Sequence, residues 1–162
     1  MMKRAFNRPT PRTLHGFTLV ELMIVVAVVA VLGVMAAPSL QSTLARIKLR
    51  GAAAEAYSDM QFARTEAVQR NADVTATFSA TGYQITQGGT TLKAVTLEGG
   101  NSVSSGAAMV VTFNALRATA AVTGGPVVFA SSATSGTVRL TVSILGRSEI
   151  CSTDSLVSVA AC

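Results

Sequence analysis

Hydrophobic residues follow three different patterns along this chain. From Phe17 to Ala37 there are 21 consecutive residues, of which only Glu21 is charged. A helix rises about 1.5 Å per residue, so this stretch would be about 30 Å long, close to the hydrocarbon thickness of a bilayer. The first pattern therefore predicts a transmembrane helix over residues 17–38.

The second pattern has a helical period and runs from Ser39 to about Asn71. Its apolar residues lie at Leu40, Leu44, Ile47, Ala53, Tyr57, Met60, Ala63 and Ala67. We therefore predict an amphipathic helix over residues 39–71 that forms the spine of a globular head. Gly51 is expected to mark the passage from a protruding stalk to packing under the head. Glu55, Asp59 and Glu66 are interpreted as solvated helix charges.

The third pattern, which begins after Asp73, is the alternation typical of β-strands, interrupted by glycine-containing turns. The predicted strands are Val74–Ser79, Tyr83–Gln87, Thr91–Leu97, Met109–Phe113, Val127–Ala130, Thr137–Ser143 and Ser148–Cys151. Glu98–Ala108 and Asn114–Pro126 are interpreted as connections, and Ser135-Gly136 as a turn. The predicted fold is α+β: a long N-terminal helix packed against an antiparallel β head of two small sheets over residues 72–162.

Charge gives the predicted membrane helix a direction. Before it lie Lys3, Arg4, Arg8 and Arg12 without any acidic residue, and by the positive-inside rule this end stays in the cytoplasm. Everything after Pro38 is then exported. The formal net charge of the chain is +5, but four of its 13 basic residues belong to this short N-terminal segment. The excess of positive charge is therefore weak evidence for nucleic-acid binding.

The border between the basic and the apolar segment carries a motif. An ordinary secretory signal is cut after its apolar region, whereas a cut after Gly16 would leave the apolar helix on the mature protein. Gly16-Phe17-Thr18-Leu19-Val20-Glu21-Leu22-Met23 resembles the prepilin processing motif of type IV pilins and type II secretion pseudopilins. The resemblance implies a leader over residues 1–16, cleavage between Gly16 and Phe17 by prepilin peptidase, and N-methylation of Phe17.

The same resemblance gives roles to two further residues. It implies that Glu21 neutralises the N-terminal amine of a neighbouring subunit during assembly. It also places Pro38 where pilin helices carry a helix-breaking proline. Proline removes one backbone hydrogen bond, so we expect the helix to be kinked or locally melted there.

The C-terminal half resembles the GspH/FimT-type minor pilins. The matching pieces are Val111-Thr112-Phe113-Asn114, Gly125-Pro126-Val127-Val128-Phe129, and Val138–Ser143 leading into Gly146-Arg147 and Cys151. Cys151 and Cys162 both fall in the exported part, where disulfides persist, so we expect them to be bonded. The Gly146-Arg147 turn followed by Cys151, with Cys162 at the end of the sequence, is more similar to FimT and FimU of type IV pili than to the secretion-system protein.

Enzyme chemistry has little support in these residues. The single histidine, His15, lies in the leader, which leaves no partner for a serine or cysteine nucleophile in the mature chain. There is no phosphate-binding loop. We therefore expect no catalytic residue, no metal and no cofactor.

DNA binding is an alternative function. Some FimT-type pilins bind DNA through a Gly-Arg-x-Arg motif, and the corresponding residues here are Gly146-Arg147-Ser148-Glu149. An acid in place of the second arginine repels phosphate. Arg147 is also interpreted as a turn residue paired with Glu149 or a carbonyl. Arg117 and Arg139 would contribute to a DNA site if they share a face with it.

The sequence thus predicts a minor type IV pilin, with a DNA-uptake pilin and a type II secretion pseudopilin as alternatives. Its expected partners are other major and minor pilins, the prepilin peptidase, the pilus assembly platform and, less strongly, DNA. Its expected location is the inner membrane, with one span, a cytoplasmic N-terminus and a periplasmic head, and later the pilus at the cell surface.

Overall fold

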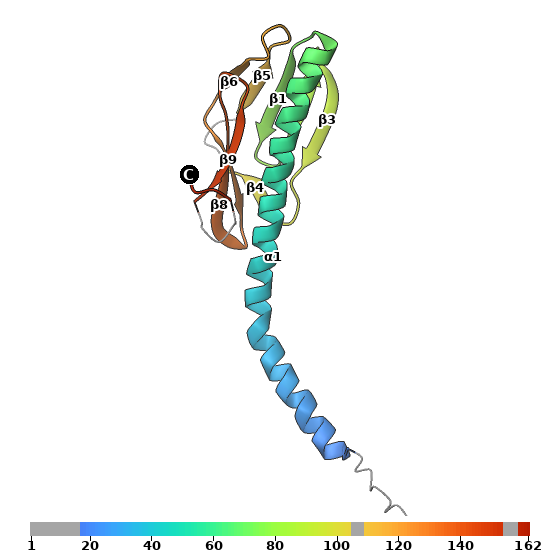
Figure 1. Ribbon diagram of the computed structural model, residues 1–162. Coiled ribbons are helices and arrows are strands. Elements are labelled where there is room, and N and C mark those ends of the chain that lie inside the picture. Colours follow the sequence, from blue (N-terminus) through green and yellow to red (C-terminus); the bar gives the residue numbers. More distant parts are fainter. Residues whose placement is uncertain (1–16, 105–108, 154–158) are drawn as a thin grey trace, which may run out of the picture. The chain divides into compact units, whose positions relative to one another are not determined.

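The computed structural model describes residues 17–104, 109–153 and 159–162 and divides the chain into two compact units, Met1–Pro38 and Ser39–Cys162 (Figure 1). The predicted leader, including Gly16, lies outside the described residues. Helix α1 (Leu19–Arg70) begins in the first unit and ends in the second. All nine strands found among the described residues belong to the second unit, which we call the head.

In the first unit, the apolar side chains of α1 have no partner within the described chain. The large hydrophobic residues from Leu19 to Val34 are 48% to 77% exposed. No single described helix combines the length and the hydropathy that a membrane crossing requires; Leu19–Val34 and Ser39–Arg70 meet both requirements only when taken together. The helix continues through position 38, so the local melting expected there is absent, and the kink expected from Pro38 stays a prediction.

In the head, α1 turns a face of small residues toward the strands. The buried hydrophobic positions are Ala45, Leu49, Ala53, Ala56, Met60, Ala63 and Ala67, which recur every three or four residues. Most of them are alanines, so the helix adds little side-chain volume to the core. The predicted face was correct from Ala53 onward and wrong before it. Leu40, Leu44 and Ile47 are exposed, and burial begins at Ala45 and Leu49 rather than at Gly51.

The first sheet has five strands in the order β3-β2-β1-β5-β6, all antiparallel. The strands are β1 (Val74–Ser79), β2 (Gly82–Gln87), β3 (Thr90–Thr96), β5 (Val110–Phe113) and β6 (Ala120–Thr123). Alternate residues point into the core, as in β1, where Val74, Ala76 and Phe78 are fully buried. The ring of Phe78 packs against that of Tyr83 on β2, with 5.1 Å between centroids. The predicted three-strand meander β1-β2-β3 is confirmed.

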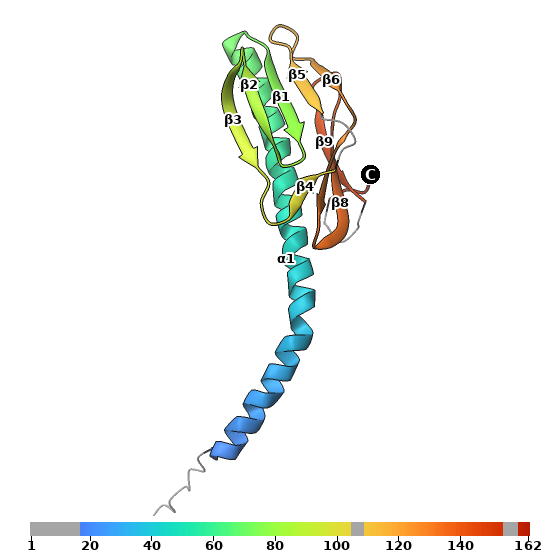
Figure 2. The same ribbon diagram turned by 180° about the vertical axis from the view of Figure 1, so that it is seen from behind.

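The second sheet has four antiparallel strands in the order β4-β7-β8-β9. They are β4 (Asn101–Val103), β7 (Val127–Ser131), β8 (Thr134–Val142) and β9 (Ser148–Ser152). Phe129, Val138 and Leu140 join the buried residues of the first sheet and of α1 in one hydrophobic core. The two views of the ribbon show α1 running along the strands of the head (Figures 1 and 2). The predicted α+β head of two sheets is confirmed.

Three local predictions were wrong. Strand β4 lies inside the predicted connection Glu98–Ala108, and β6 lies inside the predicted connection Asn114–Pro126. These strands have three and four residues, too few to show an alternating pattern, and they exist because neighbouring strands offer them hydrogen bonds. Ser135-Gly136 belongs to β8, and the chain turns instead at Ser132 and Ala133.

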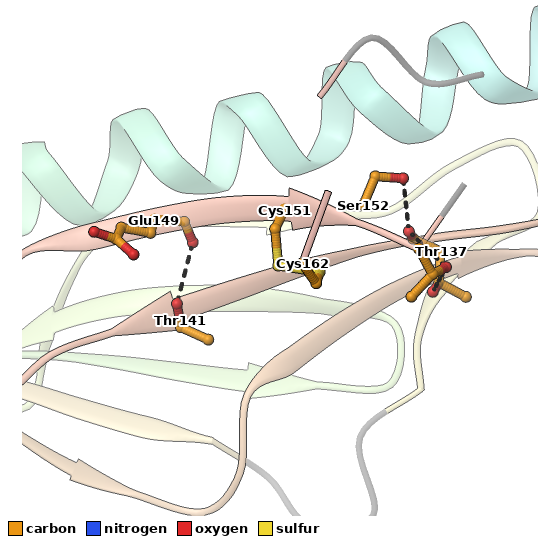
Figure 3. Close-up of a disulfide and its surroundings, with 7 residues drawn as sticks. Thr137, Thr141, Glu149, Cys151, Ser152 and Cys162 are labelled. Atoms are coloured by element: carbon orange, nitrogen blue, oxygen red, sulfur yellow. Dashed lines mark hydrogen bonds between the residues drawn. A yellow bond between two sulfur atoms is a disulfide. The ribbon is translucent and has the colours of Figure 1, made fainter. Parts of the chain in front are cut away.

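The C-terminus is tied to the second sheet by a disulfide between Cys151 and Cys162, as predicted. Figure 3 shows the disulfide between two hydrogen bonds that join β8 and β9, one from Thr141 to Glu149 and one from Ser152 to Thr137. Backbone hydrogen bonds reinforce this closure, because the amide of Ser152 donates to Ala160 at 2.8 Å and that of Cys162 donates to Ser152 at 3.2 Å. A covalent loop of this size removes about 3 kcal/mol of chain entropy from the unfolded state. Residues 154–158 of the loop are outside the described part.

Two glycines with opposite surroundings test the packing of the head. A methyl group at Gly82 would lie 2.1 Å from the carbonyl oxygen of Val95 on β3, whereas one at Gly51 would meet nothing within 4 Å. We expect Gly82→Ala to lower the free energy of unfolding by about 1–3 kcal/mol, because it overpacks two paired strands. As the matched control, Gly51→Ala should raise it by about 1 kcal/mol, because alanine favours helix. Urea denaturation of both variants checks this, and equal stabilities would contradict the close approach of β2 and β3.

Candidate functional site

The start of α1 is organised by Thr18. The backbone amide of Glu21 donates to the hydroxyl oxygen of Thr18 at 3.2 Å, and the amide of Leu22 donates to its carbonyl at 3.2 Å. Thr18 therefore caps the helix, and Glu21 stands three positions later, which is the spacing of a capping box. Thr18 was not among the predicted functional residues, although a threonine three residues before a glutamate, at the start of an apolar run, is a recognised signal for a helix start.

Glu21 itself is exposed in the first turn of α1. No ion pair in the described part of the chain involves its carboxylate, because the described pairs all belong to the head. A carboxylate at this position faces the positive end of the helix dipole, which stabilises it locally. Phe17, which precedes the cap, is 80% exposed. The structure thus leaves both the acid and the residue after the predicted cleavage point free to meet another molecule.

The predicted arginines of the head lie in different settings. Arg147 is paired with Glu149 at 3.1 Å, and both side chains are largely exposed, so the interpretation of Arg147 as a paired turn residue is confirmed. Arg117 is exposed on the connection between β5 and β6. This connection meets the turn before β9, because the amide of Ala120 donates to the carbonyl of Ile144 at 2.9 Å.

Gly146 shows how tightly these two loops pack. It has a φ of 73°, a left-handed conformation that favours glycine, so the predicted glycine turn is confirmed. A side chain there would come within 2.7 Å of the carbonyl oxygen of Ala118 and 3.2 Å of Nε of Arg64. Arg64, on α1, thus lies beside the turn that carries Arg147. This position of Arg64 depends on the tertiary fold, and no local pattern of residues predicts it.

Arg139 lies on β8, opposite Val128 of β7 and Cys151 of β9. It is half-buried, and it lines a groove rather than an exposed loop. Its Nε is buried and has no hydrogen-bond partner within the described part of the chain. A shared face for Arg139, Arg117 and Arg147 stays a prediction.

Comparison with protein-family models decides the identity of the chain. The model described as type II transport protein GspH matches residues 52–146, more than half of the chain. The chain belongs to the GspH family. The prokaryotic N-terminal methylation motif also matches, over residues 12–37, which include Gly16, Phe17 and Glu21. No curated protein and no solved structure matches the chain.

Membership of the GspH family confirms the resemblance on which the functional prediction rested. Together with the methylation motif it makes this chain a type IV pilin-like or pseudopilin subunit that is processed by prepilin peptidase. Subunits of this kind are anchored in a membrane by the apolar N-terminal helix and associate with other pilins and with a pilus or secretion machinery.

The head of this chain also contains a buried carboxylate. It belongs to Asp59, so the interpretation of Asp59 as a solvated charge was wrong. Asp59 on α1 is only 6% exposed. Its carboxylate accepts a hydrogen bond from the hydroxyl of Tyr83 at 2.6 Å and one from Nζ of Lys93 at 2.8 Å. Lys93 also donates to Glu55 at 3.3 Å. A buried charge is costly unless it is paired in this way, so these contacts fix α1 to β2 and β3.

The same contacts shift two proton equilibria. Burial, followed by the hydrogen bond to Asp59, raises the pKa of Tyr83 far above its usual range. The hydrogen bond to Asp59 also raises the pKa of Lys93, although burial opposes this. Both groups therefore keep their protons in the folded head at a pH where the unfolded chain has lost them.

We expect the free energy of unfolding to fall as the pH rises above about 10, the ordinary pKa of both groups, because the unfolded state then binds fewer protons than the folded state. In Tyr83→Phe this alkaline loss should be smaller. At neutral pH the same variant should be about 1–2 kcal/mol less stable, because Asp59 loses a hydrogen bond.

Thermal unfolding at pH 8 and in an alkaline buffer checks this expectation. Tyr57→Phe is the matched control, since Tyr57 is the other tyrosine of the chain and has no described hydrogen bond to Asp59. It should keep the full alkaline loss. An alkaline loss in Tyr83→Phe equal to that of the unmodified protein would contradict the proposed coupling.

Proposed function

We propose that this GspH-family chain is a minor type IV pilin, a structural subunit without enzymatic activity that enters a pilus or primes its assembly. The observation that carries the proposal is the exposed apolar surface of the first unit of the chain. The described side chains of its apolar helix segment are exposed, and within the processing motif it bears one carboxylate, Glu21, without an ion pair in the described chain. An apolar surface of this kind requires a membrane or other helices to cover it.

Processing would create the partner that Glu21 lacks. Cleavage between Gly16 and Phe17 leaves a positively charged amine, later methylated, at the start of the helix. When such helices pack together, the amine of one subunit neutralises Glu21 of its neighbour. Removing one partner of a buried ion pair costs about 3–5 kcal/mol, so the pair also selects correctly positioned subunits.

This function requires a defined route through the cell. The basic leader holds the N-terminus in the cytoplasm, the helix spans the inner membrane, and the head folds in the periplasm, where its disulfide forms. There the subunit meets the prepilin peptidase, the assembly platform and other major and minor pilins, and it then moves to the pilus at the cell surface. A type II secretion pseudopilin is the closest alternative. The Gly146-Arg147 turn followed by the disulfide-bonded Cys151 favours the pilus, since this arrangement resembles FimT and FimU.

Incorporation into fibres tests the role of Glu21. We expect Glu21→Ala and Glu21→Gln to reduce the amount of subunit in sheared pili by about a hundredfold or more, the factor that corresponds to the loss of a buried ion pair. Glu55→Gln, which removes an exposed acid of the head, is the matched control and should assemble normally. Mass spectrometry of the native subunit should find a methylated Phe17 at its N-terminus. Normal assembly of Glu21→Ala would contradict the proposal.

DNA uptake is a second candidate, which one observation favours. The Gly146 turn brings the guanidinium of Arg64 close to the loop that carries Arg147, and the connection carrying Arg117 packs against the same turn. Three cations thus lie at neighbouring points of the head. Against this, Glu149 already neutralises Arg147 and adds an anion where phosphate would bind. We therefore place the structural role first.

A gel-shift assay separates the two functions. The full-length protein in detergent should not retard duplex DNA, even at low salt. Glu149→Arg completes the Gly-Arg-x-Arg motif and should produce a shift that weakens as salt rises, because each phosphate contact releases counterions. Retardation of DNA by the unmodified protein, lost in Arg147→Gln, would instead support the DNA-uptake function.

A further inference from the structure

A groove of about 280 Å³ lies beside β8 in the head. Its walls are mainly apolar and come from Met109, Val122, Pro126 and Val142, while Arg139 and Thr141 supply its polar groups. The groove therefore combines an aliphatic surface with one permanent positive charge.

Arg139 is the unusual member of this groove. Its buried Nε finds no hydrogen-bond partner, and its guanidinium takes part in no ion pair among the residues that the structure describes. The acid nearest in register is Glu149, which lies opposite Thr141, two residues along β8 from Arg139. Glu149 is paired with Arg147 instead. A guanidinium without an ion pair is available to an anion, so a carboxylate that meets its accessible N–H groups gains a charge-assisted hydrogen bond without breaking another pair.

The chemistry of the groove identifies the ligand. A carboxylate matches a guanidinium in charge and in geometry, and the bond is strongest where water is excluded. The apolar walls suit the aliphatic part of a glutamate and the apolar residues next to it. A DNA backbone would instead require several cations along a track, and the groove has one. Partly buried arginines within apolar surroundings are frequent anchors of protein interfaces.

We propose that this groove binds a glutamate side chain, flanked by apolar residues, on the surface of a neighbouring subunit. The partner's carboxylate accepts hydrogen bonds from Arg139, and the adjoining apolar residues cover Val122 and Pro126. The inference deepens the proposed function and rests on it, because the neighbour is another subunit of the assembly. The groove selects which subunit adjoins the head, whereas Glu21 drives insertion of the helix.

The test uses the full-length protein, labelled with ¹⁵N, in detergent micelles. The probes are a blocked leucine–glutamate–leucine tripeptide and its glutamine counterpart, which has the same shape without the charge. The Nε–Hε resonance of Arg139 should move on addition of the glutamate peptide, with a dissociation constant of about 1–10 mM. The glutamine peptide should bind at least about tenfold more weakly, the effect expected from losing one charge-assisted bond.

Variants of the groove complete the test. Arg139→Gln should abolish the response of the backbone amides of Val122 and Thr141, and Arg139→Lys should weaken it. Arg117→Gln, which removes an exposed arginine, is the matched control and should bind as the unmodified protein does. Thermal unfolding of each variant confirms that the head is intact.

Three results would overturn the proposal: equal binding of the two peptides, unchanged binding by Arg139→Gln, or no movement of the Arg139 resonance at ten times the expected dissociation constant. A larger response to a short DNA duplex than to the glutamate peptide would assign the groove to nucleic acid and would also overturn it. Each of these failures leaves the role of Glu21 in assembly untouched, because fibre incorporation is measured separately.

Discussion

The packing of a face of small residues on α1 against the strands is the constraint on which the head depends. Five of the seven buried hydrophobic helix positions in the head are alanines, so the helix adds little side-chain volume to the core. Larger side chains, chiefly Phe78, Phe113 and Phe129, then fill the core from the strands. In a close-packed interior both a void and an extra methyl group are destabilising, so small side chains on the helix require large ones on the strands. The two sheets can therefore share one core.

The two units differ in how the surface of their hydrophobic residues is covered. The head buries its own apolar surface and closes its chain end with a disulfide. The first unit exposes nearly every apolar side chain it has. Since water does not stabilise such a surface, the first unit is complete only in a membrane or among other helices. This contrast fits a subunit whose head encloses its own core and whose helix joins an assembly.

Three charged groups of the head illustrate how burial decides function. Asp59 is buried and fully partnered, so it stabilises the fold. Arg147 is exposed and paired with Glu149, which reduces its use for binding phosphate. Arg139 is half-buried and without a partner in the described residues, which makes it available to a ligand. Arg139 and Arg147, both candidates for DNA contact from the sequence, thus take different roles because their surroundings differ.

The sequence by itself determined the features that depend on neighbouring residues. The apolar helix, the processing motif, the β1-β2-β3 meander, the Gly146 turn and the disulfide followed from local patterns or from family resemblance. Only the tertiary structure decided which face of α1 is buried before Ala53, where β4 and β6 form, and that Asp59 is paired with Tyr83 and Lys93. These features join residues that are far apart in the chain. A short strand or a buried acid gains its stability from such distant partners, so its own segment carries no signal of it.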